Sequence, residues 1–121
     1  LYDKENKCYY IKNVTFVGKQ WDSCQFHFYK DTLSYVGFGL QSDKEEVIDV
    51  YNQNIENART KYDKIEGKMS RDDPNSKQCY FDDGVIILSI GYNIKEDNFA
   101  NLIYHSRRII DQMNEDAYND I

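Results

Sequence analysis

Cysteine, histidine and proline are scarce in this chain, and their scarcity excludes several classes of protein. The 121 residues include three cysteines, two histidines and one proline. The thiols of Cys8, Cys24 and Cys79 are too few for a disulfide scaffold, and their spacing is not that of a zinc site. At most one internal disulfide can form. We therefore expect an ordinary globular domain with no metal and no cofactor.

Long apolar runs and excess positive charge are also missing. No run approaches the roughly 20 apolar residues that cross a bilayer, which predicts that no segment spans a membrane. Fifteen Lys and Arg residues stand against 21 Asp and Glu, giving a net charge of -6. Bulk electrostatics therefore disfavour nucleic acid and anionic lipid surfaces as partners.

Catalytic motifs are absent as well. The sequence has no nucleotide-binding glycine loop, no GxSxG and no HExxH. Cys24 and His27 have a metal-like interval of three, but on a strand this interval sends two side chains to opposite faces. These observations favour a non-enzymatic domain. The alternative is a small enzyme or enzyme inhibitor whose site is assembled from scattered residues such as His105, Cys24 and the segment 70–77.

Aromatic residues, by contrast, are plentiful, with eleven tyrosines, six phenylalanines and one tryptophan. The first third of the chain alternates aromatic and β-branched residues with polar ones, and this pattern predicts three strands at about 8–17, 21–29 and 33–40. In the third strand, Gly37 and Gly39 share one face and leave room there for another backbone or a bulge.

A helix is expected to follow the third strand. Ser42-Asp43-Lys44-Glu45 has the form of a capping box, which predicts that the helix begins at Ser42. An apolar stripe then recurs at intervals of three and four, with Gly67 as a plausible stop; it comprises Ile48, Tyr51, Ile55, Ala58, Tyr62, Ile65 and Met69. We expect this stripe to pack on the sheet. The alternative is a coiled-coil seam that forms a homodimer through residues 43–69.

The second half of the chain is predicted to be a loop, three strands and a helix. Residues 70–77 contain the only proline and are interpreted as an exposed loop. Strands at 78–81 and 85–93 flank a turn at Asp82-Asp83-Gly84, and the apolar run 85–88 predicts an interior strand. The segment 98–105 fits a strand or a helix, and we favour a strand that leads into a helix near Ser106.

These elements predict an α+β fold in a single domain, residues 1–121. The order is that of two β-β-β-α units, a pseudo-repeat over 8–69 and 77–119. Their antiparallel sheet, or pair of sheets, is expected to pack against a long and a shorter helix.

A disulfide between the first two cysteines is excluded by the expected pairing of the first two strands. If Val17 lies opposite Trp21, then Cys24 faces Val14, and Cys8 lies six residues further along the ladder. That separation is on the order of 20 Å, whereas a disulfide needs Cα atoms within about 7 Å. Cys79 is therefore the more plausible partner for either thiol.

A family resemblance covers most of the chain. Gly18, Trp21 and the alternating Phe26 and Phe28 lead to Leu33, and the later motifs are Lys61-Tyr62, Leu102-Ile103-Tyr104 and Asn119-Asp120-Ile121. Together they resemble a group of small exported bacterial proteins of unknown function, from which this chain departs at Asp63, where glycine is usual. The resemblance implies export and a compact α+β domain, but the group provides no catalytic or binding residues that could be assigned to positions of this chain. Since the first residue is Leu1 rather than methionine, removal of a leader is one interpretation of this start, and the compartment stays open on that ground.

The aromatic residues offer the best candidate for a binding surface. Tyr9, Trp21, Tyr29 and Tyr35 are expected on a sheet face away from the helices, where they would bind a carbohydrate or protein ligand. The alternative is that they simply cover one side of a small sheet. Arg107 and Arg108 begin the last helix, where positive charge opposes the helix dipole, and an anionic partner would explain them.

Overall fold

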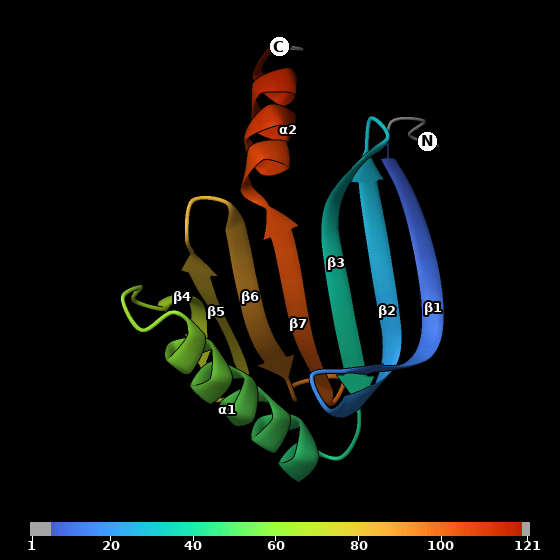
Figure 1. Cartoon of the computed structure of the whole chain (residues 1–121). Helices are drawn as coiled ribbons and strands as arrows, with labels where there is room; N and C mark the ends of the chain where they lie inside the picture. The colour runs from blue at the N-terminus through green and yellow to red at the C-terminus, as the bar shows by residue number, and fades with distance from the viewer. Residues whose placement is uncertain (1–5, 120–121) are drawn as a thin grey trace.

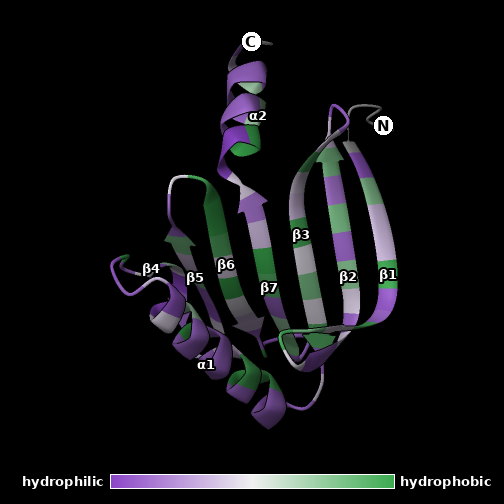
Figure 2. Cartoon of the chain, viewed as in Figure 1, coloured by the Kyte–Doolittle hydropathy of each residue, from purple (hydrophilic) through white to green (hydrophobic). Residues whose placement is uncertain are grey.

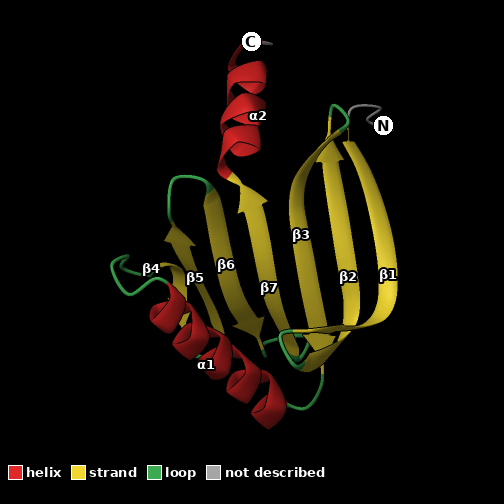
Figure 3. Cartoon of the chain, in the orientation of Figure 1, coloured by secondary structure: helices red, strands yellow, loops and turns green. Residues whose placement is uncertain are grey.

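The protein is a seven-stranded antiparallel sheet with two helices, which confirms the predicted α+β class (Figures 1 and 3). A computed structural model describes residues 6–119. Its elements in chain order are β1 (Asn6–Phe16), β2 (Lys19–Tyr29), β3 (Thr32–Gln41), α1 (Lys44–Lys61), β4 (Lys68–Asp73), β5 (Ser76–Asp82), β6 (Ile86–Asn93), β7 (Phe99–Ser106) and α2 (Arg107–Asn119). The strand order in the sheet is β1-β2-β3-β7-β6-β5-β4.

Helix α1 covers one face of the sheet, which we call the helix face, and the opposite one is the open face. The helix packs on β6 and β7 across the front of the sheet in Figure 1. Directly paired residues form rows across the strands, since cross-strand partners point to the same side. One buried row supplies the centre of the core and consists of Cys24, Phe38, Leu102, Ile90 and Cys79.

The predicted strands of the first half and the turn at residues 82–84 are confirmed. Gly84 has φ +89°, as the turn requires. The apolar run 85–88 leads into β6, an interior strand, and appears as a hydrophobic stretch at one end of β6 in Figure 2. The segment 98–105 is a strand, because β7 pairs with both β3 and β6, and the helix begins at Arg107 as expected.

The prediction of a loop at residues 70–77 is wrong. These residues form most of a hairpin, in which β4 pairs with β5 and the turn lies at Pro74-Asn75. Every residue of β4 is exposed, because this strand lies at the edge of the sheet and buries no side chain. The chain therefore has three strands before α1 and four strands between α1 and α2. Of the predicted domain 1–121, residues 1–5 and 120–121 lie outside the described residues.

The first helix begins and ends at other residues than predicted. Asp43 is the N-cap, and its Oδ1 accepts from the backbone amide of Glu46 at 2.9 Å, whereas Ser42 Oγ donates to the Glu46 carboxylate. The helix ends at Lys61, so the last part of the predicted stripe lies beyond it. Its buried residues pack on the chain's own sheet; they are Val47, Val50, Tyr51, Asn54, Ile55 and Ala58. A homodimer through residues 43–69 stays a prediction.

The pairing of β1 with β2 differs from the predicted register by three residues. Val17 and Gly18 both have positive φ, +53° and +69°, so the turn holds two residues instead of three. Cys8 consequently lies opposite His27, and Cys24 lies opposite Ile11. All three thiols are free, and Cys79 bonds to neither of the other two.

Helix α2 continues directly from β7 and is held to both halves of the sheet. Arg107 pairs with Asp82 and with Asp111, which satisfies the positive charge at the helix start without an anionic partner. At the other end of the helix, Asp116 accepts hydrogen bonds from Tyr29 and Lys30. Neither helix is long and apolar enough to cross a membrane, over the residues described.

Candidate binding site on the open face

The predicted aromatic platform does not form. Trp21 and Tyr29 are buried, at 1% and 8% exposure, because Trp21 packs against Phe38 and the Tyr29 hydroxyl is bonded to α2. Tyr9 is exposed but belongs to the helix-face row through its pairing with Phe26. Tyr35 alone lies on the open face, where it is half-buried. The four side chains therefore share no surface.

The structure instead brings Cys8, His27, Tyr35 and His105 together in one row of the open face. They come from β1, β2, β3 and β7, and each lies opposite the next in the ladder. Cys8 Sγ lies 3.3 Å from His27 Nε2. The His27 and Tyr35 rings stack with their centroids 3.9 Å apart, and the His105 ring centroid lies 5.2 Å from that of Tyr35.

Burial shifts the titration of three members of this row. It lowers the pKa of His27 and of His105, which favours neutral imidazole rings at pH 7. The pKa of Tyr35 is raised, first by burial and then by the neighbouring Cys8. The row is therefore a neutral, aromatic surface rather than a charged one.

The row does not form a metal or acid-base site. Gln25 Oε1 lies 2.9 Å from His27 Nε2 and can only accept, so in this pairing Nε2 carries the proton. No group of three metal-ligating side chains occurs within residues 6–119. Asp82 stands in the same row, but Ile87 separates it from His105, and its carboxylate is paired with Arg107.

The structure does not bring His105 together with Cys24 or Cys79, so the scattered residues named for an alternative enzyme site do not meet. Both cysteines are buried on the helix face, whereas His105 points to the open face. Cys24 and His27 lie on opposite faces, as their interval of three predicted. The segment 70–77 is at the far edge of the sheet and contributes nothing to the histidine row.

Beside this row, the open face is hollowed where β3 has two glycines. The hollow is about 120 Å³, with Gly37 and Gly39 as its floor and the rings of Tyr35 and Phe99 at its ends. A Cβ at Gly39 would stand 2.9 Å from the Phe99 ring, so glycine is required there for the ring to lie across the strand. The sequence prediction that these glycines leave room on one face is correct, although what occupies the space is a side chain.

Polar side chains from β2 and β7 border the hollow. Gln25 Oε1 is taken by His27, and Asn101 Oδ1 accepts from Gln78 Nε2 at 3.2 Å. Three side-chain groups have no hydrogen-bond partner among residues 6–119: the side-chain amide nitrogens of Gln25 and Asn101 and the hydroxyl of Ser23. The hollow therefore presents three hydrogen-bond donors between two aromatic rings.

A second cavity adjoins the hollow at Tyr35. It is about 420 Å³ and lies between the histidine row and α2, which contributes Ile110 and Met113 to the wall. The His105 ring forms no hydrogen bond within the described part of the chain, and it lines this space.

Gln25, Ser23 and Asn101 were not identified from the sequence. Each is a polar residue in an alternating strand, which is the pattern of a solvent-facing position. Only the register of β2, β3 and β7 brings them around the same two glycines.

No family model, curated protein or solved structure matches this chain.

Proposed function

We propose that the protein is a non-enzymatic binding domain that takes a carbohydrate on its open face. The observation that carries this proposal is the glycine-floored hollow with aromatic ends and unused hydrogen-bond donors. The hollow is of a size that admits about one ring, since a cavity of about 150 Å³ binds benzene.

The donors around the hollow suit a sugar ring. Hydroxyl and ring oxygens of a saccharide accept hydrogen bonds, and the amide nitrogens of Gln25 and Asn101 together with Ser23 Oγ supply them from both sides of β3. No carboxylate or ammonium lines the hollow, which agrees with a neutral ligand. Without a ligand, these donors face water. A neutral ligand can replace that water without the desolvation of a charged side chain, because none lines the hollow.

The aromatic rings supply the apolar part of the recognition. Tyr35 is held in place by its stack on His27, and Phe99 is held over Gly39. Pockets that bind small ligands combine such apolar walls with a few placed polar groups. The apolar C–H face of a pyranose can then lie against either ring while its hydroxyls reach the amides.

The test is a titration of the protein with methyl β-glucoside, methyl β-galactoside and N-acetylglucosamine, followed by backbone amide NMR. We expect at least one of the three to shift the amide signals of Gly37, Gly39 and Asn101 in a saturable way. If none of the three shifts these signals, the proposal is wrong.

Two tyrosines provide a matched pair of variants. Tyr35→Ala removes a ring of the hollow, and we expect the affinity to fall by about tenfold. Tyr9→Ala removes an exposed tyrosine on the helix face and should leave the affinity unchanged. Equal effects of the two substitutions would contradict a site on the open face.

Gly37→Ala tests the hollow itself without disturbing the fold. The added Cβ would lie 3.6 Å from Ile103 and from the Tyr35 ring, which is ordinary van der Waals contact. The variant should therefore fold like the natural protein and lose binding, because the methyl group fills the floor of the hollow. Unchanged binding in this variant would place the ligand elsewhere.

A second candidate function is a thiol-dependent activity at Cys8. The 3.3 Å contact between Cys8 Sγ and His27 Nε2 favours it, since a histidine beside a cysteine can activate the thiol. The Gln25 contact opposes it, because an Nε2 that donates to Gln25 carries a proton and cannot accept one from the thiol. Alkylation of Cys8 at neutral pH separates the two: His27→Gln should slow it markedly if His27 activates the thiol.

Export is part of the proposal. It is supported by the resemblance to small exported bacterial proteins. Expression of the full gene with its natural start, followed by cell fractionation, tests the compartment.

A further inference from the structure

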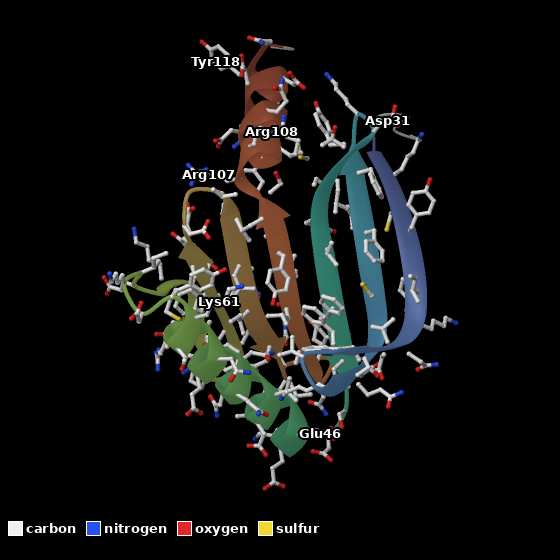
Figure 4. The ribbon with its side chains drawn as sticks, in the orientation of Figure 1. Asp31, Glu46, Lys61, Arg107, Arg108 and Tyr118 are labelled. Carbon is white, nitrogen blue, oxygen red and sulfur yellow. The ribbon has the colours of Figure 1, made fainter. Side chains whose placement is uncertain are left out.

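A separate cavity of about 270 Å³ lies on the helix face, between α1, the β1–β2 turn and the strands β6 and β7. Leu88 and Leu102 are apolar parts of its lining, and Phe16 contributes from the end of β1. Asn57 and Lys61 line it from the C-terminal half of α1, and Figure 4 places Lys61 at the end of this helix in front of the sheet. The sheet separates this cavity from the hollow on the open face.

The cavity contains a buried polar group without a partner. Asn54 lines it, is 5% exposed, and its Nδ2 is the buried side-chain nitrogen or oxygen that has no hydrogen bond within residues 6–119. A buried amide that bonds to nothing costs stability, and such groups are rare unless something satisfies them. An apolar side chain of the same size would pack there at less cost. The amide is therefore a sign of a ligand.

The walls of the cavity are held in place before any ligand arrives. Trp21 Nε1 donates to the backbone oxygen of Phe16 at 3.1 Å, and the Phe16 ring stacks on Phe38 with centroids 4.2 Å apart. Lys19 Nζ donates to Gln53 Oε1 on α1 at 2.6 Å. This hydrogen bond connects the β1–β2 turn, which lies at the lower end of the sheet in Figure 1, to the helix. A preformed site loses little entropy on binding.

The electrostatics of the cavity favour an anion at one end. Lys61 forms no ion pair within residues 6–119, and its ammonium lies 5.3 Å from the ring centroid of Tyr62. No carboxylate lines the cavity. The charge of Lys61 also acts on Asp83, but the pKa of that carboxyl is lowered first by backbone hydrogen bonds from Ile86 and Val85. The Lys61 ammonium can therefore pair with an anionic group of a ligand.

We propose that this cavity binds an apolar monocarboxylate that carries a second, uncharged oxygen. The carboxylate pairs with Lys61 beside Asn57, the apolar body lies on Leu88 and Leu102, and the second oxygen accepts from Asn54 Nδ2. Asn54 and Lys61 are seven residues apart, so the two oxygen sites are about two helical turns, or about 10 Å, from each other. A keto or amide oxygen near the far end of a medium-chain acid meets these demands. The inference stands apart from the carbohydrate proposal.

Three probes test the two polar contacts separately in the natural protein. The probes are 9-oxodecanoate, decanoate, which lacks the keto oxygen, and methyl 9-oxodecanoate, which lacks the charge. By calorimetry we expect 9-oxodecanoate to bind about two- to tenfold more tightly than either of the others, as one hydrogen bond or one partly exposed ion pair allows. The methyl NMR signals of Leu88 and Leu102 should shift. Equal affinities for all three probes, or unshifted leucine methyls, would overturn the proposal.

Substitutions then assign each preference to a residue. Asn54→Leu should abolish the advantage of 9-oxodecanoate over decanoate, and Lys61→Gln should abolish its advantage over the methyl ester. Lys64→Gln is the matched control, because Lys64 is exposed and does not line the cavity. If Asn54 were only a structural residue, Asn54→Leu would change the melting temperature and leave the keto preference intact. The comparison of probes in the natural protein decides the proposal even if a variant does not fold.

Discussion

Tyr29 and Asp116 join the two ends of the chain: the Tyr29 hydroxyl on β2 donates to Asp116 Oδ2 on α2 at 2.6 Å. Lys30 Nζ donates to the same oxygen at 2.9 Å, and Gln112 Nε2 donates to the other at 2.8 Å. These hydrogen bonds lower the pKa of Asp116 to about 2, with Tyr29 the largest cause. The last helix is therefore attached to the first hairpin by an ionised carboxylate.

The attachment of α2 should weaken in acid. Since the folded pKa of Asp116 lies below its unfolded value of about 3.9, its contribution to stability is present above pH 4 and is lost as the pH falls towards 2. Asp116→Asn should therefore lower the urea midpoint at pH 7, and the difference from the natural protein should shrink below pH 4. Tyr29→Phe should raise the Asp116 pKa, measured by carboxyl NMR. A pKa that stays near 2 in that variant would contradict the assignment.

The two histidines of the open face should make the fold less stable in mild acid. Burial lowers the pKa of His27 and of His105 below the unfolded value of about 6.5. Their neutral forms are favoured in the fold, so stability is full above pH 6.5 and falls as the pH drops below it. Ring NMR should show both histidines titrating below 6.5. His105→Gln should flatten the decline in unfolding free energy between about pH 6.5 and pH 5.

The three thiols should differ sharply in reactivity. Cys8 is exposed, whereas Cys24 and Cys79 are buried and burial raises the pKa of both. Ellman's reagent should titrate one thiol in the native protein and all three in denaturant, and peptide mapping after iodoacetamide should locate the native modification at Cys8. Cys8→Ser provides the control, since it should leave no rapidly reacting thiol. Fast modification of Cys79 in the native protein would show that the core row is open.

The start of α1 depends on Asp43. Removing its carboxylate leaves the amide of Glu46 without the 2.9 Å hydrogen bond that caps the helix. Asp43→Ala should cost about 1 kcal/mol of unfolding free energy in urea, whereas Ser42→Ala, which removes a side-chain contact with Glu46, should cost less. A larger effect at Ser42 would restore the capping box that the sequence predicted.

The elements that bury a face could be predicted from the sequence. Alternation along β2 and β3 and the apolar run into β6 reflect burial, so the residue pattern carries the signal. Strand β4 has no such signal, because its residues Lys68–Asp73 are all exposed and their pairing depends on backbone hydrogen bonds to β5. A charged edge strand therefore has the composition of a loop.

The candidate sites could not be predicted from the sequence, because the register of the strands decides which side chains lie together. The turn at Val17-Gly18 holds two residues instead of the expected three, and this shift in register places Cys8 opposite His27. Gln25 and Asn101 are unremarkable in the sequence and meet only through the pairing of three strands. Asn54 lies on the same side of α1 as the apolar stripe, but the lack of a hydrogen-bond partner for its Nδ2 is a property of the packed structure.

The two outer strands of the sheet differ in how they face other molecules. Strand β4 carries both signs of charge and an irregularity between Met69 and Arg71, features that discourage pairing with a neighbouring chain. Strand β1 has eleven residues, no proline, and exposed Tyr9, Tyr10 and Ile11, and no strand among residues 6–119 covers its outer side. Of the two edges, β1 therefore has fewer of the features that discourage pairing with another strand.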